Sequence, residues 1–201
     1  MKYLVLVVAF LLGAMCSGSA DAQGVSKKGL GITIPKGCEQ RGSSSWSQHG
    51  LPKLTVVVVS CDDPYVMWIV ARRSTSSGYE TAESTHFRGG DFGFNGIEIN
   101  DVNNFNVALL DSRSMTMPVN FEYQFSWRHR AWVLLSSYFD WTQNCGGSFG
   151  DGSKVTINYI SGKVRVDEYE KCEPHKSYNT MQKPQVVSLE KFAPLDPPVY
   201  P

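Results

Sequence analysis

Strict alternation of apolar and polar residues over positions 119–127 is the clearest pattern in the chain. Side chains of a β-strand point alternately to its two faces, so such an alternation indicates a strand with one buried face. The pattern therefore predicts a half-buried strand that turns at residues 128–130 and returns over residues 131–139. The apolar positions are Val119, Phe121, Tyr123, Phe125 and Trp127, and the polar ones are Asn120, Glu122, Gln124 and Ser126.

A continuous β-branched run over residues 54–60 predicts a central strand that is covered on both faces. A turn at residues 62–65 joins it to a second apolar strand at 66–71, whereas the polar stretch 74–85 predicts a long loop. Shorter alternating segments follow up to about residue 170, which makes about eight or nine strands and no convincing helix. The predicted class is all-β, a single antiparallel β-sandwich, with a closed barrel as the alternative.

The N-terminus has the features of an export signal. Lys2 precedes an apolar run over residues 3–15, and the small residues that follow place Ala20 and Ala22 as a cleavage site. We therefore expect a signal peptide over residues 1–22, a Gly/Pro-rich lead-in over 23–37, an all-β domain over 38–182 and a Pro-rich extended tail over 183–201. The processed protein is predicted to be secreted and extracellular, without a transmembrane segment.

Removal of Cys16 with the signal leaves four cysteines: Cys38, Cys61, Cys145 and Cys172. An even number in an oxidising compartment predicts two disulfides. Three pairings are possible, and we favour Cys38–Cys61 with Cys145–Cys172 because these close the shortest loops. The chain has no C-x-x-C motif and its histidines are scattered, so neither a metal site nor a cofactor is predicted.

Composition and motifs exclude some functions. The chain has 19 basic and 19 acidic residues, and a net charge of zero argues against electrostatic capture of nucleic acid as the main activity. The Gly-rich stretch 145–152 has the spacing of neither a phosphate-binding loop nor a nucleophile elbow, so it predicts a flexible strand connection. No catalytic motif emerges from the remaining residues.

The hairpin tip contains the strongest candidate site. It is formed by Trp127, Arg128, His129, Arg130 and Trp132. Indoles stack on sugar faces or lie at lipid interfaces, and guanidinium groups pair with carboxylates and phosphates. The alternative interpretation is that both indoles pack inward and the arginines form a solvated turn.

These features favour a secreted, non-enzymatic binding or matrix protein whose partner is a matrix component, a glycan or another surface ligand. A membrane-binding protein is the first alternative. Residues 120–124 and the adjoining tip resemble the aromatic lipid-contacting strand of actinoporin-like cytolysins, which are secreted β-sandwiches. The pore-forming helix of that family would fall in residues 23–37, which Gly and Pro break, and the family usually lacks cysteines.

Two further hypotheses are a carrier protein and a hydrolase, and each requires a specific tertiary arrangement. A lipocalin-like carrier of a small apolar ligand would need a closed barrel, although Ser45-Trp46-Ser47 stands where the G-x-W start of that family would be expected. An exported hydrolase would need an active site assembled from distant residues, in which one of four histidines supplies the base: His49, His86, His129 or His175.

Overall fold

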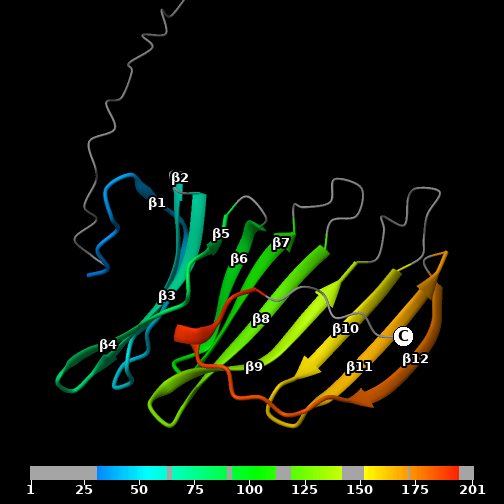
Figure 1. Ribbon diagram of the computed structural model, residues 1–201. Coiled ribbons are helices and arrows are strands. Elements are labelled where there is room, and N and C mark those ends of the chain that lie inside the picture. The colour runs from blue at the N-terminus through cyan, green and yellow to red at the C-terminus, as the bar shows by residue number, and fades with distance from the viewer. Residues whose placement is uncertain are drawn as a thin grey trace, which may run out of the picture.

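The computed structural model describes residues 31–62, 65–89, 92–111, 119–141, 152–171 and 173–194. These residues form two antiparallel sheets and a single 3₁₀ turn, η1, at Leu189–Lys191 (Figure 1). The all-β class is therefore confirmed. The signal peptide over residues 1–22 and most of the lead-in lie outside the described residues.

The smaller sheet, called here the N-terminal sheet, has the strand order β1-β2-β3-β4, and β5 also pairs with β3. Its strands are β1 (Cys38–Trp46), β2 (Leu54–Asp62), β3 (Tyr65–Thr75), β4 (Gly78–Glu83) and β5 (Phe87–Arg88). The β2–β3 hairpin was expected from the two apolar runs. The long loop predicted over residues 74–85 is wrong, because β3 continues to Thr75 and β4 pairs with it in register.

The larger sheet, called here the C-terminal sheet, is a meander in the order β12-β11-β10-β9-β8-β7-β6. Its strands are β6 (Phe92–Asp101), β7 (Asn104–Asp111), β8 (Val119–Arg128), β9 (Ala131–Asp140), β10 (Gly152–Asn158), β11 (Lys163–Glu170) and β12 (Glu173–Met181). The alternation is confirmed over residues 120–125 of β8, where Phe121, Tyr123 and Phe125 are buried. Beyond a register shift at Gln124/Phe125 it breaks down, because Ser126, expected on the polar face, is also buried.

The two faces of β2 pack into different clusters, which explains its continuous apolar sequence. Leu54, Val56 and Val58 face a large core shared with the C-terminal sheet. Val57 and Val59 face the other way, into a smaller cluster that the lead-in residues Ile32 and Ile34 cover. The β-branched run is therefore buried on both faces, as expected.

The sheets approach each other most closely at β1 and β6, where the ring of Phe94 occupies the space that a Cβ atom on Gly42 would need. Each sheet nevertheless keeps its own edge strands within the described residues. The closed-barrel alternative is thus not supported, and neither is the calyx that a lipocalin-like carrier requires.

The C-terminal segment returns from β12 and joins the two sheets, as the red ribbon in Figure 1 shows. Ser188 forms a bridge with Val133 of β9, and the backbone N–H of Thr85 donates to the carbonyl of Phe192. Leu189 and Phe192 are buried in the shared core. The predicted extended tail thus begins with a stretch that contributes two core residues.

One of the two expected disulfides is present, between Cys38 of β1 and Cys61 of β2. These residues lie directly opposite each other in the strand register, so the bond fastens the ends of neighbouring strands. Cys145 and Cys172 lie outside the described residues, and their pairing remains a prediction.

Among the described residues, no helix has the length and hydropathy needed to cross a bilayer.

Candidate ligand-binding site

The tip predicted from the sequence is a two-residue turn between β8 and β9. Arg128 pairs with Ala131, which leaves His129 and Arg130 as the turn, with φ values of 50° and 63°. Positive φ at both positions is what the right-handed twist of a two-residue hairpin requires, and Asn-Gly is the usual choice for it. The neighbouring strands therefore hold a histidine and an arginine in a conformation that neither favours.

Relief of this strain gives a stability prediction. His129→Asn is expected to raise the free energy of unfolding by about 0.5–1 kcal/mol, since asparagine tolerates positive φ better than histidine. Urea denaturation measures the change. The matched control is His49→Asn in the β1–β2 connection, where φ is not positive, and its effect should stay within about 0.5 kcal/mol. Equal effects of the two substitutions would contradict the strain.

The two indoles of the tip have different surroundings. Trp132 is only 1% exposed and stacks edge-on against Phe105, with 4.9 Å between ring centroids. Trp127 packs against Trp132 at 5.2 Å but is only partly buried. The guanidinium of Arg73 lies 5.3 Å from the centre of the Trp127 ring, and the Trp127 backbone N–H donates to the carbonyl of Asn103 at 2.7 Å. Both rings are thus held in place from several sides.

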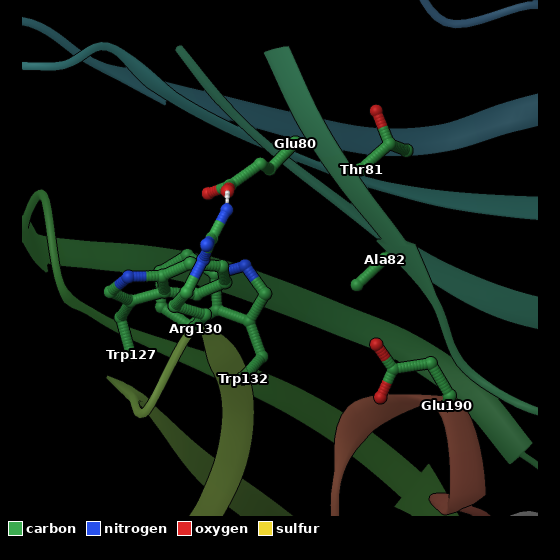
Figure 2. A pocket seen from close by; sticks show the side chains of 7 residues that line it. All are labelled: Glu80, Thr81, Ala82, Trp127, Arg130, Trp132 and Glu190. Carbon is green, nitrogen blue, oxygen red and sulfur yellow. Dashed lines mark hydrogen bonds and ion pairs between the residues drawn. The ribbon is translucent and has the colours of Figure 1, made fainter. Parts of the chain in front are cut away.

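A half-open pocket of about 270 Å³ lies beside these indoles. Three segments that are far apart in the sequence line it: β4, the β8–β9 tip and η1 (Figure 2). The lining residues are Glu80, Thr81, Ala82, Trp127, Arg130, Trp132 and Glu190. Arg130 reaches from the tip to Glu80, and its Nη2 atom lies 3.3 Å from the Glu80 Oε1 atom.

The structure brings together only part of the predicted tip. Trp127, Arg130 and Trp132 line the pocket, whereas Arg128 and His129 are exposed and lie outside its lining. The carboxylates of Glu80 and Glu190 were not predicted, because Glu80 fell in the expected loop and Glu190 in the expected tail. No local signal in the sequence links either glutamate to the tip.

The lining can make several kinds of contact with a small polar ligand. The partly exposed indole of Trp127 offers apolar surface, and the carboxylates of Glu80 and Glu190 accept hydrogen bonds. Arg130 supplies donors at the rim, where its side chain is 87% exposed. This combination suits a ligand with many hydroxyl groups and at least one apolar face.

The shifted pKa values belong to a different part of the protein, the face of the C-terminal sheet formed by β9, β11 and β12. Hydrogen bonds from Arg165 and then from Ser177 lower the pKa of Asp167. Burial, and then the nearby Asp140, raise the pKa of Tyr138. Tyr138 bonds Asp140 within β9, Arg165 bonds Asp167 within β11, and Ser177 of β12 bonds Asp167 across the strand pair, so we interpret these groups as structural. No cluster of three potential metal ligands occurs in the part of the chain that the structure describes.

Comparison with known proteins identifies no relative of this chain. No protein-family model matches it. Neither a curated protein nor a solved structure matches it either.

Proposed function

We propose that the protein is exported, loses residues 1–22 and acts outside the cell as a non-enzymatic binding protein on a β-sandwich scaffold. The cross-strand disulfide between Cys38 and Cys61 supports an oxidising compartment. The two sheets with their shared core support the scaffold. Binding is assigned to the pocket beside the β8–β9 tip. Strands β4, β8 and β9 hold most of its lining residues in fixed positions, and the pocket is open to solvent on one side.

The proposed ligand is a saccharide unit of a glycan or matrix polysaccharide. The observation that carries this assignment is the placement of the partly exposed Trp127 ring, backed by the buried Trp132, next to the carboxylates of Glu80 and Glu190. Sugar rings present C–H faces that stack on aromatic rings, and hydroxyl groups that donate to carboxylates. Packing against Trp132 and Arg73 limits the movement of the Trp127 ring, which lowers the entropy lost on binding.

A glycan microarray followed by calorimetry with the best saccharide tests the proposal. Trp127→Ala should weaken the affinity about tenfold or more, because the stacking surface is removed. Glu190→Gln keeps the shape of an exposed side chain and should weaken the affinity severalfold through loss of a charged acceptor.

The control is Tyr65→Ala, which removes an exposed aromatic ring. Tyr65 begins β3, whereas Glu80 pairs with Arg73 near the other end of that strand. The control substitution should leave saccharide affinity unchanged. Absence of saccharide binding, or binding that survives both pocket substitutions, would overturn the assignment.

A further inference from the structure

Neighbouring strands run antiparallel in both sheets, so every second connection lies at the same end of its sheet. One such set of connections from each sheet lies at a common end of the molecule. In the N-terminal sheet these are the β1–β2 and β3–β4 connections, and in the C-terminal sheet they are β6–β7, β8–β9, β10–β11 and the end of β12. A hydrogen bond from Arg73 to Asn103 and the ion pair between Arg130 and Glu80 join the two sets. Figure 1 shows these connections along the lower side of the ribbon. We call this surface the turn rim, formed by residues 47–53, 75–80, 101–104, 128–131, 159–163 and 181–187.

Exposed apolar side chains gather on the turn rim. Six large hydrophobic residues are exposed in the described part of the chain, and five of them belong to it: Leu51, Tyr79, Ile160, Met181 and Val186. Val186 is 78% exposed and Met181 63%. The sixth, Tyr65, begins β3 at the opposite end. Single exposed apolar residues are ordinary, but their concentration on one end marks a contact surface.

The exposed charges of the turn rim all have one sign. They belong to Lys53, Arg128, Arg130, Lys163 and Lys183. The rim's acidic residues, Glu80 and Asp101, are half-buried and engaged: Glu80 pairs with Arg130, and Asp101 accepts a hydrogen bond from the Asn103 backbone N–H at 2.6 Å.

Among the described residues of the opposite end, acidic and basic side chains are mixed. Glu39 and Asp62 are exposed beside Lys36 and Arg88. The protein therefore combines a net charge of zero with one cationic end.

We infer that the turn rim docks onto the surface of an anionic phospholipid bilayer. Exposed apolar side chains at separate turns and strand ends can enter the interface, while the surrounding cations meet lipid phosphate and carboxylate groups. A soluble polyanion would match the cations but would leave the apolar side chains in water, so the two observations together favour a lipid surface. The rim shares Glu80 and Arg130 with the saccharide pocket, but the inference rests on the exposed residues outside that pocket.

Flotation of the purified, processed chain with vesicles tests this inference. We expect binding to vesicles of phosphatidylcholine with phosphatidylserine, much weaker binding to phosphatidylcholine alone, and release at high salt. Lys163→Gln with Lys183→Gln should weaken binding more than tenfold, since each cation near an anionic surface contributes about fivefold. Ile160→Ser, Met181→Ser and Val186→Ser together should also weaken it by at least about tenfold.

Matched substitutions at the opposite end serve as controls. Tyr65→Ser and the pair Lys36→Gln with Arg88→Gln remove the same kinds of side chain and should leave vesicle binding unchanged. None of the tested residues lines the pocket, so a failure here leaves saccharide binding to be judged by its own variants. Absence of binding to phosphatidylserine vesicles would overturn the inference. The inference would also be overturned if the apolar triple variant bound vesicles as well as the native chain does, and if both chains bound a soluble sulfated polysaccharide equally well.

Discussion

Replacement of Phe192 by alanine is expected to lower the free energy of unfolding by about 3–5 kcal/mol. The Phe192 ring is 1% exposed and contacts Tyr123 and Phe125 edge-on, at centroid distances of 4.8 and 5.1 Å. Its removal opens a cavity in the shared core. It also loosens the segment that links β4 to β9 through η1. The effect should be large because the rings of Tyr123 and Phe125 in β8 both lose their contact with the tail.

Urea denaturation followed by tryptophan fluorescence measures the change. Val186→Ala is the matched control from the same segment, since Val186 is exposed and its truncation should alter the free energy by no more than about 0.5 kcal/mol. A loss below about 1 kcal/mol for Phe192→Ala would show that this segment does not belong to the cooperative core.

Removal of the Cys38–Cys61 disulfide should be the second largest effect. Substitution of both cysteines by serine is expected to cost about 3 kcal/mol, because the bond closes a loop with a sequence separation of 23 residues and restricts the unfolded chain. Cys61 also belongs to the smaller cluster, where Ile32 and Ile34 cover β2. Loss of the bond should therefore expose the lead-in to proteolysis before the rest of the domain.

The free energies of unfolding of the double variant and of the native chain are compared without reductant. The other cysteines then keep the same state in both chains, so the difference reports the Cys38–Cys61 bond alone. Limited proteolysis with mass spectrometry locates the first cut, which we expect near residues 31–37. Unchanged stability together with an unchanged first cut would show that the β1–β2 pairing holds the lead-in without the disulfide.

Strands with a regular apolar pattern were predictable because the pattern is local. The β-branched run of β2 and the alternation of β8 each specify their burial within the strand itself. Strands β4 and β12 were missed because their sequences are mostly polar, and they form as edge strands that pair with β3 and β11. Their stability comes from the neighbouring strand and not from their own pattern.

The candidate site was predictable only in part, for the same reason. Trp127, Arg130 and Trp132 are close in the sequence and meet in one hairpin, so local reasoning places them together. Glu80 and Glu190 come from β4 and η1, and only the packing of three segments brings them to the tip. The turn rim also depends on packing, because its exposed apolar and cationic residues come from five separate segments of the chain.

The amino-acid sequence alone determined that this chain forms extended strands with turns at defined places, and that its β8–β9 tip holds two tryptophans and two arginines. These properties follow from side-chain periodicity and turn geometry, which act over a few residues. Only the tertiary structure decided that the strands form two sheets, that the tail enters their shared core, and that a neutral chain has a cationic, apolar end. Those features depend on which distant segments pack together, and that is set by the burial of apolar surface over the whole protein.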